Sequence, residues 1–229
     1  FLGTGNNVST SISTGDINSV YSLSFTDPYF TDDGVSRHLS VYKKAVDTKG
    51  QLDGQAAYKT DSLGGTVSFN FPISEYNNIT VGTTLDLTQL ELTGDAPQAY
   101  KNYCTSVGTS GSTCDTSSWL FYTGYMKDTR NDALFPTMGT KFNVVADVTA
   151  PVLDVKYYRL GIATEKFFPW GGTVSTRLKG DVGYIDSYGG DTLPFYKKFK
   201  VGGQKTVRGY KEASIGKKVY DDTYKKYIT

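Results

Sequence analysis

The strongest constraint on the fold of this chain is an alternation of apolar and small polar residues with a period of two, which recurs along most of its length. Tyr21, Leu23 and Phe25, for example, are separated by serines, and Val67 and Phe69 belong to a similar run. A period of two places the apolar residues on one face of an extended strand and the polar residues on the other. The sequence therefore predicts a β-rich protein.

Nine segments show this pattern strongly enough to be predicted as strands. They lie at about residues 6–14, 18–27, 35–44, 58–71, 79–91, 117–128, 140–150, 154–167 and 173–187. Several have about the length that a tilted strand needs to cross a bilayer. The strand that runs from Trp119 to Met126 carries aromatic residues on both faces, so its faces stay unassigned.

Composition excludes two other classes of protein. The 229 residues are 38% hydrophobic and 14% aromatic, and no apolar run approaches the roughly eighteen residues of a membrane-spanning helix. If the chain lies in a membrane, strands must carry it across. The 24 basic and 23 acidic residues give a net charge of +1, which provides no electrostatic basis for binding nucleic acid.

The connections between the predicted strands alternate between two kinds. One kind is compact and combines proline with aromatic or apolar residues, at residues 27–30 (DPYF), 71–76 (FPISEY), 134–136 (LFP) and 167–170 (FFPW). The other kind is polar and often long, at residues 14–18, 43–59, 91–118 and after 188. Aromatic turns at one membrane interface and long loops on the opposite side are typical of outer-membrane barrels. We therefore predict a transmembrane, antiparallel, up-and-down β-barrel with long extracellular loops.

A soluble β-sandwich or a lipocalin-like barrel is the alternative, because period-two alternation alone does not exclude it. Two observations favour the membrane barrel: the aromatic turns recur at every second connection, and the polar faces carry small residues with few charges. Arg177, Lys179 and Asp181 share one face of one strand, and Asp86 lies on the polar face of another. We expect these four charged residues to face the lumen.

The chain contains two cysteines, Cys104 and Cys114, within a polar run that is typical of an exposed loop. We predict a disulfide that closes this loop, and hence an oxidising compartment. Two reduced thiols are the alternative. A metal site is not expected, because His38 is the single histidine and lies far away in the sequence.

Several segments resemble the BamA family of outer-membrane assembly barrels. Four of them are similar to successive periplasmic turns of that family, at residues 1–5 (FLGTG), 26–35 (TDPYFTDDGV), 71–77 (FPISEYN) and 135–140 (FPTMGT). Residues 194–196 (PFY) and 202–210 (GGQKTVRGY) resemble the family's sixth extracellular loop, which folds back into the lumen. The resemblance covers nearly the whole chain, and the combination of turns is more specific than any one motif.

The resemblance implies an expected barrel of sixteen strands, of which this chain would contain the third to the eleventh. Residues 1–188 would form part of the transmembrane wall, and residues 189–229 would begin the long loop that enters the lumen. The amino-terminal periplasmic domains and the strands that form the family's lateral seam would lie outside this chain. We therefore expect the chain to be a fragment, which an odd strand count also suggests.

Within that loop, the resemblance assigns the lumen lid to Val207, Arg208, Gly209 and Tyr210. A guanidinium inside a barrel needs an acidic or carbonyl partner. In the family the acidic partner of the arginine belongs to a strand beyond Thr229, so Asp86 and Asp181 are substitutes to examine.

The implied function is the folding and insertion of β-barrel proteins into the bacterial outer membrane. Its partners would be the outer-membrane lipid bilayer, unfolded outer-membrane protein clients and, through parts outside this chain, accessory lipoproteins. No nucleophile with a histidine base, metal cluster or phosphate loop is present, so neither an enzyme nor a cofactor is expected. A two-partner-type secretion transporter of the same superfamily is the first alternative, and a diffusion porin is the second.

Overall fold

The computed structural model describes most of the chain. The described residues are 5–15, 18–47, 58–93, 96, 98–107, 113–171, 174–199, 201–203, 206–210, 215–216, 219–221 and 226–228. The family-like segment at residues 1–5 and the loop at residues 43–59 therefore lie partly outside the described residues.

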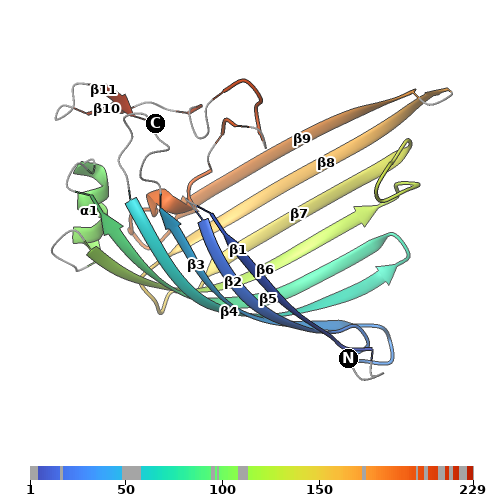
Figure 1. Ribbon diagram of the computed structural model, residues 1–229, viewed down its shortest axis with the longest axis horizontal. Coiled ribbons are helices and arrows are strands. Elements are labelled where there is room, and N and C mark those ends of the chain that lie inside the picture. The colour runs from blue at the N-terminus through green and yellow to red at the C-terminus, as the bar shows by residue number, and fades with distance from the viewer. Residues whose placement is uncertain are drawn as a thin grey trace.

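Within these residues nine strands form one antiparallel sheet in which every strand pairs with its sequence neighbour, in the order β1 to β9. The strands are β1 (Asn7–Thr14), β2 (Asn18–Asp27), β3 (Ser36–Asp47), β4 (Tyr58–Ser74), β5 (Asn77–Leu92), β6 (Thr113–Asp128), β7 (Gly139–Thr149), β8 (Tyr157–Gly171) and β9 (Val174–Ser187). The remaining elements are α1 (Gln98–Ser106), the 3-10 helix η1 (Phe195–Lys197) and a small sheet of β10 (Val219–Asp221) and β11 (Lys226–Ile228). Figure 1 shows a strongly curved sheet with α1, β10 and β11 near one end of the strands.

The nine predicted strands are confirmed, and most of their ends lie within three residues of the prediction. Two strands continue past the prolines at which we expected them to stop. β4 extends through Pro72 and β8 through Pro169, and the strand register shifts just after each proline. A proline cannot donate a ladder hydrogen bond, but a β-bulge accommodates it at the end of a strand.

The two faces of the sheet differ in chemistry. One face, the outer face, exposes apolar side chains such as Leu23, Val41, Leu85 and Val182, and no described residue covers them. The other face, the inner face, carries polar pairs across neighbouring strands. Three are hydroxyl pairs, Ser9–Ser24, Ser62–Thr88 and Thr66–Thr84, and in the fourth Thr26 contacts the imidazole of His38. A soluble barrel would place the apolar face inward, whereas this sheet turns it outward, as a membrane barrel does.

The structure also assigns the faces of β6, which the sequence left open. Trp119, Phe121 and Tyr125 are 40%, 41% and 37% exposed and lie on the outer face. Leu120 and Tyr122 alternate with them on the inner face, where Tyr122 pairs with Asp147 of β7. The indole N–H of Trp119 donates to Thr83 Oγ1 at 2.7 Å, so this polar group is satisfied on the outer face.

Glycines on the inner face make room for tyrosine rings from the neighbouring strands. Gly64 lies directly opposite Tyr42, and Gly82 lies opposite Tyr122. A Cβ atom at Gly82 would lie 2.5 Å from the Tyr122 ring, and one at Gly64 would collide with the Tyr42 ring. Each ring therefore lies flat over its glycine, and the glycine backbone provides part of its packing surface.

The aromatic turns all lie at the end of the sheet opposite α1, as predicted (Figure 1). The turn between β6 and β7 is fixed by side chains that bond its backbone. Asp132 accepts hydrogen bonds from the amides of Leu134 and Phe135 at 2.7 and 2.8 Å, and these bonds lower the pKa of its carboxyl group. The turn therefore presents Leu134 and Phe135, each 82% exposed, on an ordered backbone.

None of the helices in the described part of the chain has both the length and the apolar character needed to span a membrane.

The packing of tyrosine over glycine predicts that Gly64→Ala destabilises the sheet. A methyl group at this position must displace the Tyr42 ring, which should lower the free energy of unfolding by about 1–3 kcal/mol. The measurement is the denaturant midpoint of the full-length protein in detergent. Gly65→Ala is the matched control, because a Cβ atom there has no neighbour closer than 3.8 Å. Equal midpoints for the two variants would contradict the prediction.

Candidate functional site: the loop that crosses the inner face

The segment that follows β9 turns back across the inner face of the sheet. Within it, η1 reaches the ends of β4, β5 and β6, which are several strands away from β9 in the sheet. Pro194, which precedes η1, is fully buried. We call residues 194–199 the clasp, because they join β9 to the opposite part of the wall.

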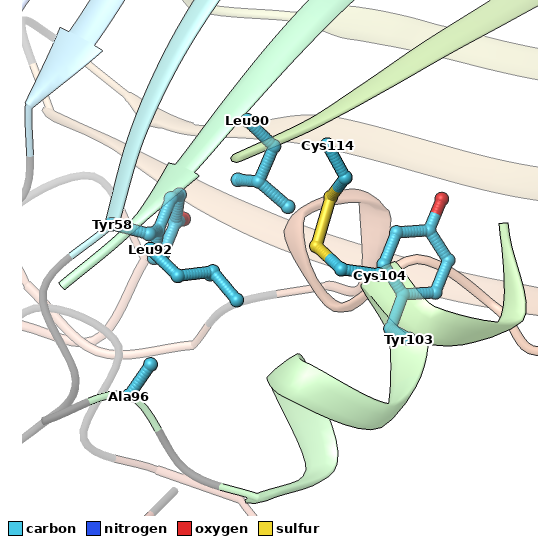
Figure 2. Close-up of a cluster of buried hydrophobic side chains, with 7 residues drawn as sticks. All are labelled: Tyr58, Leu90, Leu92, Ala96, Tyr103, Cys104 and Cys114. Atoms are coloured by element: carbon cyan, nitrogen blue, oxygen red, sulfur yellow. A yellow bond between two sulfur atoms is a disulfide. The ribbon is translucent and has the colours of Figure 1, made fainter. Parts of the chain in front are cut away.

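A small hydrophobic core receives the clasp. It consists of buried residues from β4, β5, the connection between β5 and α1, α1 and the start of β6, namely Tyr58, Leu90, Leu92, Ala96, Tyr103, Cys104 and Cys114. Figure 2 shows these side chains gathered between the strand ends and α1. Tyr100, Phe195 and Tyr196 pack against this core and are themselves partly buried.

Aromatic rings make most of the contacts between the clasp and the core. Phe195 stacks on Tyr100 with ring centroids 3.6 Å apart and an interplanar angle of 6°. Phe195 also meets Tyr58 and Tyr103 edge-on at 5.2 and 6.0 Å. Aromatic pairs of this kind contribute about 0.5–1.5 kcal/mol each beyond their buried area. Burial raises the pKa of Tyr100, Tyr103 and Tyr196 above the ordinary tyrosine value, so all three hydroxyls are neutral at physiological pH.

The predicted disulfide between Cys104 and Cys114 is formed, and it links α1 to the start of β6. The prediction of a loop over residues 91–118 was wrong in part, because α1 lies within it and β6 already begins at Thr113. The helix is short and polar, and its packing against strands and clasp was not visible in its own sequence.

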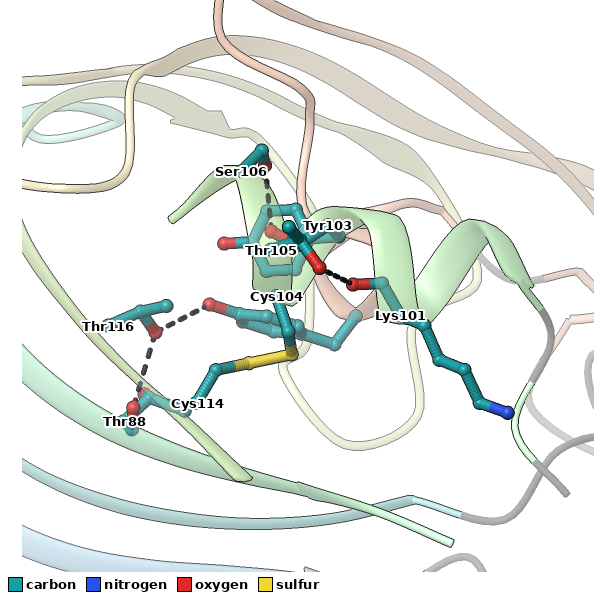
Figure 3. The surroundings of a disulfide bond; sticks show 9 residues. Thr88, Lys101, Tyr103, Cys104, Thr105, Ser106, Cys114 and Thr116 are labelled. Atoms are coloured by element: carbon teal, nitrogen blue, oxygen red, sulfur yellow. Dashed lines mark hydrogen bonds between the residues drawn. A yellow bond between two sulfur atoms is a disulfide. The ribbon is translucent and has the colours of Figure 1, made fainter. Parts of the chain in front are cut away.

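Hydrogen bonds link the disulfide region to the clasp. Figure 3 shows Thr116 of β6 beside the disulfide, with its hydroxyl donating to the carbonyl of Thr88 at 3.2 Å. The Tyr196 hydroxyl lies 3.0 Å from Thr116 Oγ1. Tyr196 therefore contacts β6 close to the point where the disulfide joins it.

Two further contacts anchor the end of the clasp. Lys197 Nζ lies 3.4 Å from Asp86 Oδ2 on the inner face of β5. Phe199 lies against Gly183 of β9, where a Cβ atom would come within 2.5 Å of the ring. The clasp thus contacts both the strand that precedes it and a strand on the far side of the lumen.

The tetrapeptide Val207 to Tyr210 lies beyond the clasp in a compact turn. The carbonyl of Tyr210 accepts a bond from the Gly203 amide at 3.1 Å, and Thr206 bonds both backbone groups of Gly202 at 2.8 Å. Gly209 has a φ of 88°, a conformation that favours glycine. Arg208 is exposed, and no acidic side chain in the described ranges forms an ion pair with it.

The four predicted lumen charges all lie on the inner face, and each forms an ion pair with another charged side chain of the described chain. Asp86 pairs with Lys197, Lys179 with Asp181 at 3.1 Å, and Arg177 with Glu165 at 2.7 Å. Asp86 and Asp181, which we considered as partners of Arg208, therefore bind lysines instead. Sequence reasoning missed the pair of Asp147 and Arg159, in which the aspartate is buried. Their inward positions on adjacent predicted strands were the available signal, but the register that makes them neighbours was not known.

An outward apolar face, an inner face of hydroxyls and neutralised charges, and a loop that folds across that inner face define the wall of a membrane-spanning β-barrel with a loop inside its lumen. Residues 1–226 match the model of the Omp85 superfamily domain, and the chain belongs to this family. It is a protein of the bacterial outer membrane.

Two relatives are informative. The chain is 34% identical over 205 residues to the outer membrane protein assembly factor BamA of Neisseria meningitidis serogroup B, a match that covers 88% of this chain and 26% of that protein. The crystal structure of BamA from Haemophilus ducreyi lacking POTRA domains 1–3 superposes with a TM-score of 0.88 and 27% sequence identity. That match covers 95% of this chain and 42% of the other, so this chain spans less than half of either relative.

Replacing Phe195 with alanine should release the clasp. Because the variant loses ring pairs worth about 1 kcal/mol each, we expect trypsin cleavage after the exposed Lys198 to accelerate at least about tenfold in the folded, full-length protein. Cleavage is measured by mass spectrometry of the products. Phe135→Ala is the control, because that ring is exposed at the opposite end of the sheet. An unchanged cleavage rate in Phe195→Ala would contradict the assigned contacts.

Removing the disulfide should loosen α1 and the clasp together. The double variant Cys104→Ser, Cys114→Ser is expected to lose about 2–3 kcal/mol of stability, because the bridge no longer restricts the unfolded chain. The thermal midpoint in detergent and the cleavage rate after Lys198 measure the two effects. Reducing the native protein should reproduce both effects, and a change in neither would contradict the prediction.

Proposed function

We propose that this chain forms part of the wall and the lumen lid of a barrel that folds and inserts other β-barrel proteins into the outer membrane. The observation that carries the proposal is the 34% identity to a BamA over 88% of the chain. The clasp supports it, because a loop that is anchored on both sides of the lumen suits a closed barrel better than an open pore.

In this proposal the clients are unfolded outer-membrane proteins, and accessory lipoproteins bind parts of the protein outside this chain. An unpaired strand edge in a barrel leaves backbone donors and acceptors that are costly in lipid. Such an edge can form backbone hydrogen bonds with a client strand without recognising its side chains, which is a form of β-augmentation. The strands described here are each paired with their sequence neighbours, so we assign them the role of a supporting wall. We assign no catalytic chemistry and no cofactor to the chain.

We propose that Val207 to Tyr210 form the lid element of this barrel, held near the lumen by the clasp. The support is the turn centred on Gly209, which follows the clasp directly and leaves the Arg208 guanidinium exposed for a partner. A strand of the complete barrel would supply the acidic side chain, because a guanidinium fork binds a carboxylate best in a bidentate contact.

A dedicated secretion transporter of the same superfamily is the second candidate, and a diffusion porin is the third. The inner-face charges weigh against the porin. Asp86, Asp147, Glu165 and Asp181 each pair with a basic side chain, whereas a selective pore carries rows of charge at its constriction.

Depletion of the full-length parent protein in its own cell separates the three candidates. If the proposal holds, quantitative mass spectrometry of the outer membrane should show a broad fall in β-barrel proteins, and expression of the native protein should restore them. Loss of one secreted protein alone would identify the dedicated transporter. An unchanged protein profile with reduced solute uptake would identify a porin.

A further inference from the structure

One arginine of the sheet faces away from the lumen. Arg37 lies on β3 opposite Asp27 of β2 and Phe69 of β4. It alternates with inward-facing His38 and therefore shares the outer face with Leu39. It lies at the end of the sheet that carries the turn between β2 and β3. This end lies far from α1 (Figure 1), on the side of the aromatic turns. The guanidinium is thus placed where the apolar belt meets the periplasmic headgroups.

The guanidinium of Arg37 is held by rings and by one carboxylate. Its Cζ atom lies 4.3 Å from the centroid of the Phe30 ring and 5.9 Å from that of Phe25. The nearest carboxylate oxygen, Asp27 Oδ2, lies 3.6 Å from Arg37 Nη2, which is an ion pair but too long for a hydrogen bond. Within the described residues, no hydrogen-bond partner is found for its Nε. The side chains of Arg37 and Asp27 remain 31% and 20% exposed.

The other arginines of the wall are arranged differently. Arg130 and Arg177 each donate to a carboxylate at 2.7 Å, from Asp128 and Glu165 respectively, and Arg159 donates to Asp147. These three guanidinium groups therefore have carboxylate partners within the protein. Arg37 lacks such a bond, although it lies on the surface with the least water. Its Nε is buried, but the side chain is 31% exposed, so its terminal Nη groups are free to bind a group that lies against the outer face.

We propose that Asp27 and Arg37 together bind the headgroup of a zwitterionic phospholipid that carries a primary ammonium group. The lipid phosphate accepts hydrogen bonds from the Nη groups of Arg37, and the ammonium donates to the Asp27 carboxylate. The rings of Phe25, Phe30 and Phe69 lie beside the glycerol and the upper acyl chains, as aromatic residues do at membrane interfaces.

Charge and position identify this occupant. The Asp27–Arg37 pair is neutral overall, so it complements a headgroup that is also neutral but carries both signs. A purely anionic headgroup would meet the repulsion of the Asp27 carboxylate. The pair also lies on the same face as the lipid-covered apolar belt, so a lipid reaches it without leaving its leaflet. This inference depends on the lipid-facing surface alone, and its failure would not affect the assembly function proposed above.

The test measures which lipid stays bound. The full-length protein is placed in nanodiscs that contain equal amounts of phosphatidylethanolamine and phosphatidylglycerol, released, and examined by native mass spectrometry. The native protein should retain phosphatidylethanolamine preferentially. Arg37→Gln should lower retention of both lipids about fivefold, because one headgroup cation is lost. Asp27→Asn should keep total retention and shift the preference towards phosphatidylglycerol.

Lys166→Gln is the matched control. Lys166 faces outward on β8, with its Nζ 5.0 Å from the Phe168 ring, and no described carboxylate pairs with it. If the proposal is correct, this variant leaves the lipid preference unchanged. Equal losses in Arg37→Gln and Lys166→Gln would overturn the proposal, and so would a native protein that does not discriminate between the two lipids. Heat-modifiable migration on a gel confirms that each variant is folded.

Discussion

In a hydrocarbon environment each backbone amide or carbonyl without a partner costs several kcal/mol, so a chain that crosses the bilayer as strands must pair them laterally. The nine-stranded sheet follows from this requirement, because each strand is bonded to its sequence neighbour along nearly its full length. Pairing also fixes the alternation of side chains between lipid and lumen. The outer apolar belt, the inner hydroxyl pairs and the positions of the inner charges all depend on it.

The clasp is held on the inner face mainly by the packing of aromatic rings, with one ion pair between Lys197 and Asp86. Glycines opposite tyrosines leave room on the inner face for the tyrosine rings. In the same way, Gly183, which lies opposite Gly161, leaves space in which Phe199 can lie. On the far side, α1 and its disulfide support the rings that hold Phe195. The clasp is therefore anchored on two separate parts of the wall, whereas Val207 to Tyr210, which follow it, are exposed.

Charged side chains are paired differently on the two faces of the sheet. Inside, each described acid named here has a basic partner within the protein, which limits the desolvation penalty. On the outer face, Arg37 is only loosely paired with Asp27 and lies among aromatic rings. The contrast suggests that the inner pairs stabilise the barrel, whereas the outer pair remains available to the membrane.

The sequence by itself determined the strands, their outward faces and the single-layer connectivity, because period-two alternation and turn residues are local properties. It also indicated the disulfide, through two cysteines in one polar run. Tertiary structure alone decided the faces of β6, the existence of α1, the pairing of Asp86 with Lys197 and that of Asp147 with Arg159. Each of these depends on strand register or on a contact between segments far apart in the chain. Such contacts are set by how the whole sheet curves, and no local pattern contains that information.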